Sequence, residues 1–180
     1  MIEQDITQVI LVDENDVEIG TAEKMAAHRD GGRLHRAFSV LIFDRDVNLM
    51  LQRRAWDKYH SQGLWTNTCC SHPYPGESTI DAAHRRLREE MGFDTELEHK
   101  FEFVYRADLD TGLTEYEYDH VYIGYYEGLP ECNPNEVAQW KWSDLEILKM
   151  DMEKHPESYT VWFHKIMEEY WKRGCFKSFM

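Results

Sequence analysis

The sequence predicts an α+β or α/β domain in which helices pack against a mixed β-sheet. Apolar runs of strand length recur along the first two thirds of the chain, and helix-length segments follow near its C-terminal end. No linker or internal repeat divides the 180 residues, of which 42% are hydrophobic and 13% aromatic. This composition excludes a disordered chain and provides enough apolar surface for one core.

Residues that favour turns separate the predicted elements. In chain order these elements are strands over 8–12 and 17–21, a helical turn over 23–28, strands over 37–43 and 47–52, a helix over 80–91, strands over 101–106 and 116–125, and helices over 143–152 and 158–172. The polar triplet Asp44-Arg45-Asp46 predicts a hairpin between the two middle strands. Residues 61–76, rich in Gly, Pro, Ser and Asn, predict a loop. Ser78 or Thr79 can cap the helix that follows, and Gly92 stops it.

An acidic charge balance limits the partners of this chain. Thirty-four acidic and 20 basic residues give a formal net charge of −14, so neither nucleic acid nor an anionic membrane is an expected partner. No apolar run approaches the roughly 18 residues of a membrane span, and the acidic start of the chain lacks a signal-peptide pattern. The four cysteines contain no CxxC pair, which predicts reduced thiols in a soluble, cytoplasmic protein.

Side chains that bind metal ions gather at three places: His28 with His35, His72, and Glu115 with Glu117. Because residues i and i+2 of a strand point to one face, both carboxylates can reach one ion. Three imidazoles and two carboxylates suit an octahedral-type site for Mn²⁺, Fe²⁺ or Zn²⁺. In a chain with nine histidines and 34 acidic residues, ordinary surface positions are the alternative.

The helix predicted over 80–91 carries a second group of candidates. Glu89 and Glu90 near its end can hold Mg²⁺ on a diphosphate, while Arg85 and Arg86 pair with phosphate oxygens. The alternative is a solvated helix face with ion pairs between residues i and i+4.

Cys70 and Trp162 each allow two interpretations. A cysteine two residues before a possible histidine ligand can be an activated thiol whose pKa is lowered by nearby cations or a metal. Buried cysteines are more often inert hydrophobes. The indole of Trp162 can offer a face to a cation or simply fill the core.

Taken in order, seven segments resemble type I isopentenyl-diphosphate isomerases, a branch of the Nudix superfamily. They are EKMAAH (23–28), RLHRAFSV (33–40), RRAWDK (53–58), GLWTNTCCSHP (63–73), GES…RRLREEMG (76–92), FVYRA (103–107) and TEYE (114–117). The resemblance implies an α/β/α-like Nudix fold, with a mixed β-sheet flanked by helices and an N-terminal β extension. It divides the chain into an extension over 1–30 that packs on the core, a catalytic domain over 31–168 and a C-terminal tail over 169–180.

The resemblance implies an activity, the isomerisation of isopentenyl diphosphate to dimethylallyl diphosphate by a 1,3-allylic proton shift through a tertiary carbocation. It places Cys70 and Glu117 as an opposed pair flanking the substrate, either of which can protonate C4. Tyr105 would aid Glu117, and Trp162 would face the cation. The diphosphate ligands would be Lys24, Arg54, Lys58 and Arg86.

Two metal sites are implied as well. A site for Mn²⁺, or Zn²⁺ or Fe²⁺, would use His28, His35, His72, Glu115 and Glu117. A Mg²⁺ ion bound with the substrate diphosphate would use Glu90 and the backbone carbonyl of Cys70. The only expected partner is the small-molecule substrate, and the expected assembly is a monomer or a weak homodimer.

The Nudix box, G-x5-E-x7-R-E-U-x-E-E-x-G-U with U aliphatic, is matched in part. The matching residues are Glu77, Arg85, Leu87, Glu89, Glu90 and Gly92, and the departures are Ser71, Arg86 and Phe93. Arg86 replaces a carboxylate that hydrolytic members use around their metal, which favours binding a diphosphate over cleaving it. A Nudix-type metal-dependent diphosphohydrolase is the alternative function, and a histidine-rich metal-binding or regulatory protein is the non-enzyme alternative.

Overall fold

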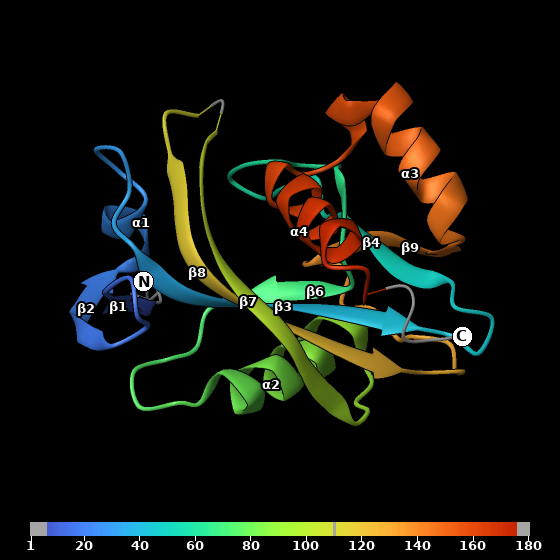
Figure 1. Ribbon diagram of the computed structural model, residues 1–180, viewed down its shortest axis with the longest axis horizontal. Coiled ribbons are helices and arrows are strands. Elements are labelled where there is room, and N and C mark those ends of the chain that lie inside the picture. The colour runs from blue at the N-terminus through green and yellow to red at the C-terminus, as the bar shows by residue number, and fades with distance from the viewer. Residues whose placement is uncertain (1–6, 110, 176–180) are drawn as a thin grey trace.

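One mixed β-sheet forms the centre of the fold, and helices cover both of its faces (Figure 1). The computed structural model describes residues 7–109 and 111–175. The elements, in chain order, are β1 (Gln8–Val12), β2 (Glu18–Glu23), α1 (Lys24–Ala27), β3 (His35–Phe43), β4 (Leu49–Arg54), β5 (Trp65–Thr66), β6 (Cys69–Ser71), α2 (Thr79–Met91), β7 (Leu97–Asp108), β8 (Thr114–Tyr125), β9 (Val137–Ser143), α3 (Leu145–Lys154), the 3-10 turn η1 (Pro156–Ser158) and α4 (Val161–Lys172). Helix α2 lies on one face of the sheet, and α3 and α4 lie on the other (Figure 1). The predicted fold class is confirmed.

Strand β3 connects the two strands that carry the candidate proton-transfer residues. It pairs with β8 in parallel along its whole length, beginning with His35 opposite Glu117. It also pairs with β6 in antiparallel orientation, where Ser39 lies opposite Cys70. Strand β8 pairs on its other side with β7 to form a long hairpin. Glu117 and Cys70 therefore come from strands on opposite sides of β3.

The hairpin predicted between 37–43 and 47–52 is only partly correct. Its turn forms, because the N–H of Val47 donates to the carbonyl of Asp44 at 3.1 Å. In the described chain, however, β3 and β4 share a single register pair, Phe43 with Leu49. Strand β4 then diverges and pairs with β9 and β5, while β3 pairs with β6 and β8. The sequence pattern predicted that β3 and β4 would pair with each other. In the structure, strands distant in sequence form most of the backbone hydrogen bonds of both.

Several other boundaries differ from the sequence prediction. The loop predicted over 61–76 contains the short strands β5 and β6, and β9 was not predicted. Strands β5 and β6 have only two and three residues, which is too few for an alternating hydrophobic pattern to appear. The helix predicted over 158–172 begins at Val161, after η1 and the N-cap residue Thr160. The boundary predicted between 168 and 169 falls inside α4, and the division of the chain into three parts stays a prediction.

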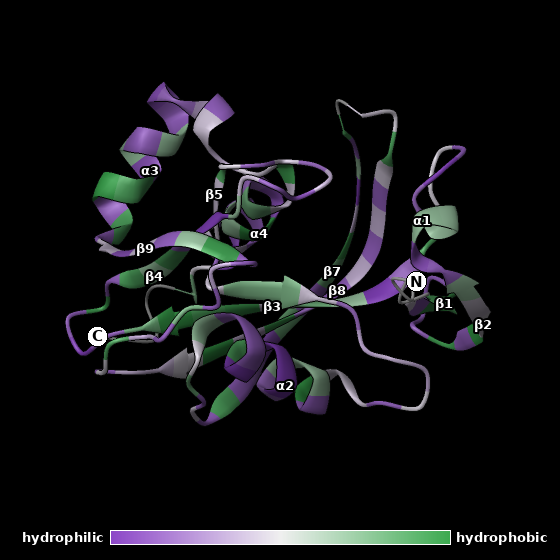
Figure 2. Cartoon of the chain, turned by 180° about the vertical axis from the view of Figure 1, so that it is seen from behind, coloured by the Kyte–Doolittle hydropathy of each residue, from purple (hydrophilic) through white to green (hydrophobic). Residues whose placement is uncertain are grey.

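The two faces of β3 belong to two hydrophobic cores. Leu41 and Phe43 pack in the cluster that contains α4, whereas Phe38, Val40 and Ile42 pack in the cluster that contains α2. All five are fully buried, and burial of each such side chain stabilises the fold by about 1.5–3 kcal/mol. Figure 2 shows β3 as a largely hydrophobic strand, with hydrophilic stretches on α2 and α3.

Helix α2 ends before Gly92 as predicted and begins at Thr79, one residue earlier than predicted, with Ser78 as its N-cap. The Ser78 hydroxyl accepts a hydrogen bond from the N–H of Asp81 at 3.2 Å, and Gly92 ends the helix in the left-handed conformation, with φ 73°. A Cβ at Gly92 would lie 2.2 Å from the carbonyl oxygen of Glu131, so the position requires glycine. No helix in the described part of the chain is long and apolar enough to cross a membrane.

The N-terminal strands attach α1 to the rest of the sheet. Strand β1 pairs with β2 and with the start of β3. In the turn between β1 and β2, the Asp16 carboxylate accepts from Nε of Arg36 at 2.7 Å and contacts Nε2 of His120 at 2.8 Å. The N–H of Thr114 donates to the carbonyl of His28 at 2.8 Å. The Asp16 contacts therefore hold the turn between β1 and β2 against β3 and β8, and the Thr114 bond holds the end of α1 against β8.

Candidate active site

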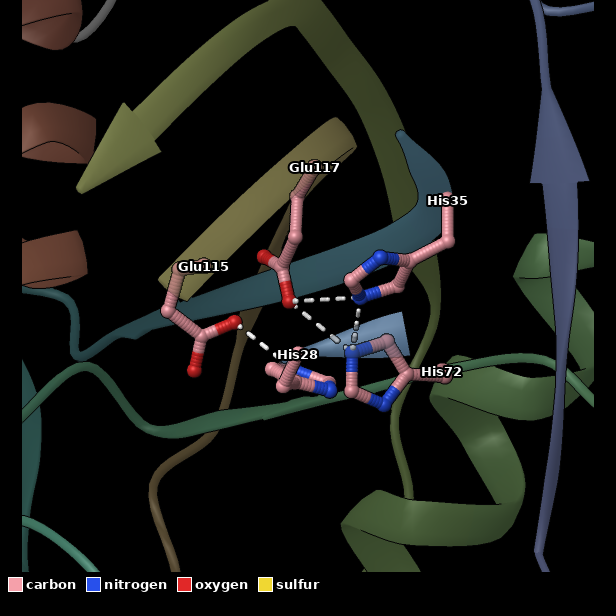
Figure 3. A group of neighbouring side chains, drawn as sticks. All are labelled: His28, His35, His72, Glu115 and Glu117. Atoms are coloured by element: carbon pink, nitrogen blue, oxygen red, sulfur yellow. Dashed lines mark hydrogen bonds and ion pairs between the residues drawn. The ribbon is translucent and has the colours of Figure 1, made fainter. Parts of the chain in front are cut away.

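Five metal-type side chains selected from the sequence converge in one cluster (Figure 3). Ligand atoms of His28, His35, His72, Glu115 and Glu117 all lie within 4.8 Å of one another. In Figure 3 dashed lines join His35, His72 and Glu117 at the middle of the group and connect Glu115 to His28. Three imidazoles and two carboxylates form a donor set that suits a divalent metal ion.

Sheet register, rather than closeness in sequence, assembles this cluster. His35 opens β3 and lies opposite Glu117 of β8 in the parallel pair. Glu115 precedes Glu117 by two residues on the same strand and points to the same face, as predicted. His72 follows the last residue of β6, and His28 caps the C-terminal end of α1.

Backbone carbonyls fix the proton positions on two of the rings. Nδ1 of His28 lies 2.6 Å from the carbonyl oxygen of Lys24, and Nδ1 of His35 lies 2.8 Å from that of Arg33. Because a carbonyl can only accept, each Nδ1 carries a proton and donates it. The Nε2 atoms are then the available metal ligands, and both face other members of the cluster.

The donor atoms are packed closely against one another. Nε2 of His35 and Nε2 of His72 lie 3.2 Å apart, and Nε2 of His72 lies 2.8 Å from Oε1 of Glu117. Burial lowers the pKa of His72 to about 3, so its ring is neutral near pH 7. Burial and the neighbouring charge of Glu117 raise the pKa of Glu115. A divalent cation would relieve this crowding of buried donors and acidic groups, so the residues fit a metal site.

A cleft with about 750 Å³ of empty volume, its open mouth included, lies beside the cluster. The side chains predicted to bind or transform a substrate all line it. They are Lys24, Arg54, Lys58, Cys70, Arg86, Glu90, Tyr105, Glu117 and Trp162. His28, His72 and Glu115 line the cleft too, whereas His35 is fully buried and does not.

Cys70 and Glu117 enter the cleft from the strands on either side of β3. Oη of Tyr105 donates to Oε2 of Glu117 at 2.6 Å. Burial favours a proton on Glu117, but hydrogen bonds with two histidines outweigh it and hold its pKa well below the usual range. Burial and the charge of Glu90 raise the pKa of the Cys70 thiol. Among the protein's own side chains, burial outweighs the nearby Arg54, so they do not lower the pKa of this thiol. The activated-thiol interpretation of Cys70 stays a prediction.

The cationic side of the cleft has unused hydrogen-bond donors. Nε of Arg54 and Nε of Arg86 are buried and have no hydrogen-bond partner within the described residues. Unpaired buried N–H groups are rare, and guanidinium groups match phosphate oxygens closely. Lys58 forms an ion pair with Glu136, which also lies 3.5 Å from Nη2 of Arg86. This side of the cleft fits a compact anion such as a diphosphate.

Glu90 lies at the end of α2 and is 5% exposed. Its Oε1 accepts from Nη2 of Arg86 at 2.6 Å, and its Oε2 accepts from Nε2 of Gln52 at 2.7 Å. The solvated-face interpretation of this helix fails for the Arg86–Glu90 pair, which lines the cleft. It holds for the exposed Glu89, which forms the neighbouring i,i+4 pair with the half-buried Arg85 at 3.4 Å.

Trp162 is both a core residue and a cleft residue. It packs with the α4-side core and is 4% exposed. Its Nε1 donates to Oγ1 of Thr66 at 2.9 Å, and the guanidinium carbon of Arg54 lies 5.1 Å from its ring centroid. The two interpretations of this tryptophan are therefore compatible.

Some cleft residues were missed in the sequence, among them Gln52, His60, Thr66 and Glu136. Thr66 lies inside the specific Trp-Thr-Asn motif, so a signal for it existed. The other three are isolated polar residues in a strand, a loop and a turn, where spacing carries no pattern. Burial lowers the pKa of His60 to about 3, which makes it a neutral ring near pH 7.

Comparisons with known proteins agree on the fold and on the family. The model of the NUDIX domain matches residues 33–163. An Isopentenyl-diphosphate Delta-isomerase 2 of Aromatoleum aromaticum is 58% identical over 155 residues, which cover 86% of this chain and 82% of that protein. An Isopentenyl-diphosphate Delta-isomerase of Pectobacterium atrosepticum is 48% identical over 96% of this chain and 97% of its own length. A crystal structure of a Deinococcus radiodurans protein superposes with a TM-score of 0.76 at 18% identity, covering 90% of this chain and 98% of that one.

Proposed function

The chain belongs to the Nudix domain family and to its isopentenyl-diphosphate Delta-isomerase branch, and from this premise we propose that it converts isopentenyl diphosphate into dimethylallyl diphosphate. One observation carries the proposal: a single cleft holds a candidate proton-transfer pair together with an anion site. Cys70 and Glu117 form the pair, and the unpartnered Nε atoms of Arg54 and Arg86 belong to the anion site within the described residues.

The reaction adds one proton and removes another. Protonation of C4 turns the alkene into a tertiary carbocation at C3, and loss of a proton from C2 then gives the trisubstituted alkene. We assign these two proton transfers to Cys70 and Glu117, which reach the cleft from opposite sides of β3. The hydroxyl of Tyr105 holds one oxygen of Glu117 in place at 2.6 Å.

The intermediate cation needs an electron-rich neighbour and protection from water. The buried indole of Trp162 is the aromatic face that we assign to it. Water in the cleft would trap the cation as an alcohol, so a closed, largely buried surface around C3 favours the isomerised product. The diphosphate would bind to Lys24, Arg54, Lys58 and Arg86 on the cationic side.

Two divalent ions complete the proposal. We assign Mn²⁺ to the cluster of three histidines and two glutamates, whose donor set also suits Zn²⁺ and Fe²⁺. An ion there supplies positive charge beside Glu117 and favours its charged form. We assign Mg²⁺, bound with the diphosphate, to Glu90 and the backbone carbonyl of Cys70, where its charge offsets that of the phosphates.

The same chemistry bears on where the protein works. The proton transfer assigned to Cys70 needs a reduced thiol, and all four cysteines of the chain are free. A reducing compartment preserves such thiols, so we propose that the enzyme acts in the cytoplasm. We also propose that it works as a monomer or a weak homodimer.

Isotope incorporation tests the proposed reaction directly. The protein, loaded with Mg²⁺ and Mn²⁺, is incubated with isopentenyl diphosphate in deuterated water and followed by NMR. We expect dimethylallyl diphosphate with deuterium in its new methyl group and no release of inorganic phosphate. Release of phosphate would favour a Nudix diphosphohydrolase, and an unchanged substrate with a folded, metal-loaded protein would favour a metal-binding protein without this activity.

A further inference from the structure

A second groove lies next to the catalytic cleft. It has about 1100 Å³ of empty volume, open solvent included. Its apolar part is formed by Leu64, Leu109, Tyr159 and Val161. Within the described residues, His60 is the one residue that lines both the groove and the cleft. The position of His60 therefore marks the boundary between the two spaces.

His60 is held firmly at this boundary. It is 6% exposed, and its ring packs edge-on against Trp162 and Tyr59, with centroid distances of 5.7 and 4.5 Å. Its Nδ1 lies 3.1 Å from Oγ of Ser61. Nη2 of Arg54 donates to its carbonyl oxygen at 3.2 Å. Contacts with both the ring and the backbone make His60 a fixed wall.

The hydrocarbon part of a bound substrate would meet this wall. Arg54, Lys58 and Arg86 form the side of the cleft that suits the diphosphate. The aromatic surface made by His60 and Trp162 is then left for the carbon skeleton. A branch longer than the methyl group on C3 would have to pass through the position of His60 to reach the apolar part of the groove.

We propose that His60 determines substrate specificity by closing the catalytic cleft toward the groove and so limiting the length of the hydrocarbon that the enzyme accepts. The proposal rests on the isomerase function proposed above. When a smaller residue replaces His60, the groove would take the alkyl extension of a branched alkenyl diphosphate.

The test compares two substrates on the metal-loaded protein. One is isopentenyl diphosphate, and the other is 3-propylbut-3-enyl diphosphate, in which a propyl group replaces the methyl on C3. For wild type and His60→Ala, kcat/KM is measured with each substrate by NMR. We expect the ratio of kcat/KM for the propyl substrate over the natural one to rise about tenfold or more in His60→Ala, the scale on which pockets discriminate added methylenes. The ratio is the readout because an opened cleft admits water and lowers both rates.

Three further variants make the result specific to this wall. His60→Phe keeps an aromatic ring at the boundary and should leave the ratio low. His60→Ala combined with Leu109→Trp fills the groove and should cancel the gain. His164→Ala changes a histidine that lines only the groove, and the ratio should stay at the wild-type value.

The outcomes separate the two proposals. A wild-type protein that does not isomerise isopentenyl diphosphate would overturn the proposed function itself. A wild type that does so, with an unchanged ratio in His60→Ala, would overturn only the role of His60. If His60→Ala does not fold, His60→Asn, which is smaller than histidine but keeps a polar group near Ser61, serves in its place with the same expected direction.

Discussion

The indole N–H of Trp162 donates to the hydroxyl oxygen of Thr66 at 2.9 Å, and Thr66 in turn donates to Oδ1 of Asn67 at 2.9 Å. Nδ2 of Asn67 donates to the carbonyl of Cys69 at 2.7 Å. A continuous chain of buried hydrogen bonds therefore joins the aromatic face assigned to the cation with the backbone next to Cys70. Thr66 lies at its centre, and we infer that it is a positioning residue.

Thr66→Val tests this role, because valine keeps the shape of threonine but removes the hydroxyl. The buried N–H of Trp162 would lose its acceptor, at a cost of about 1–3 kcal/mol in the free energy of unfolding. We expect kcat to fall roughly ten- to a hundredfold, with a smaller change in KM, because the proposed function assigns the indole of Trp162 to the carbocation. Thr66→Ser should restore most of kcat. A Thr66→Val enzyme with wild-type kcat would refute the positioning role.

The second prediction concerns the two adjacent cysteines. Cys70 lines the cleft, whereas Cys69 is fully buried in the core on the α2 side, as expected for successive residues of a strand. Cys70→Ala and Glu117→Gln should each abolish turnover while the protein stays folded. Cys69→Ala should keep its activity and lose only about 1 kcal/mol of stability. Activity lost in Cys69→Ala would mean that the wrong thiol was assigned.

Hydrogen exchange in the same variants identifies the proton donor. A variant that keeps the donor but lacks the base can protonate C4 and take the proton back. In deuterated water, it should place deuterium at C4 of recovered isopentenyl diphosphate without forming product. We expect such exchange in only one of Cys70→Ala and Glu117→Gln. Exchange in both would contradict a division of the two steps between these residues.

The third prediction concerns the diphosphate ligands. Arg86 lines the cleft, whereas Arg88 lies on the same helix with a side chain that is 55% exposed. Arg86→Ala should raise KM for isopentenyl diphosphate about tenfold or more, because it removes a charged donor from the anion site. Arg88→Ala should leave KM unchanged. Steady-state kinetics at fixed ionic strength measures both, and an unchanged KM in Arg86→Ala would contradict the assignment.

The fold class and most strand and helix positions could be predicted because hydrophobic periodicity acts locally. The pairing of β3 with β6 and β8 could not be predicted, since tertiary contacts determine which strands pair. For the same reason the sequence suggested that His35, His72 and Glu117 were ligands but did not show that they meet. Their meeting follows from sheet register.

The cleft shows a similar limit. Residues inside recognisable motifs, such as Cys70 and Arg86, could be selected from the sequence. Gln52 and His60 lie outside any spacing rule, and only the folded chain brings them to the cleft. The direction of the Cys70 pKa was also beyond the sequence, because it depends on burial and on Glu90.

The fourth prediction concerns stability and pH. Nε and Nη2 of Arg85 donate to the two oxygens of Glu77 at 2.8 Å each. The hydrogen bonds with Arg85 lower the pKa of Glu77 from its usual value of 4.5. A carboxylate with a lowered pKa stabilises the fold above its unfolded pKa, and this contribution is lost as the pH falls through the lower folded value.

Glu77→Gln should therefore unfold more easily than wild type at pH 7. The difference should shrink as the pH falls below about 4.5, where wild type begins to lose the same contribution. Urea unfolding across this range measures it. Glu131→Gln, at an exposed carboxyl group, is the matched control and should show little difference at any pH. A Glu77→Gln deficit that persists unchanged in acid would show that the charge is not responsible.

The last prediction separates metal binding from substrate binding. His35 is the one member of the five-residue cluster that does not line the cleft, so changing it leaves the cleft surface intact. Mn²⁺ at about a hundred times its Kd should stabilise the wild type by about 2.7 kcal/mol, seen as a rise in Tm. In His35→Gln the Kd for Mn²⁺, measured by calorimetry, should increase at least about tenfold and the Tm rise should shrink.

His84→Gln provides the matched histidine control for this experiment. His84 lies on α2, and its Nδ1 is 2.6 Å from Oδ1 of Asp94, which follows the helix. It does not belong to the five-residue cluster, so the Mn²⁺-dependent rise in Tm should remain. Chelation of the ion should abolish turnover in wild type and in His84→Gln alike, and added Mn²⁺ should restore it. If His35→Gln bound Mn²⁺ as tightly as wild type, the ion would have to lie elsewhere, and the proximity of His35 to Glu117 would then reflect packing alone.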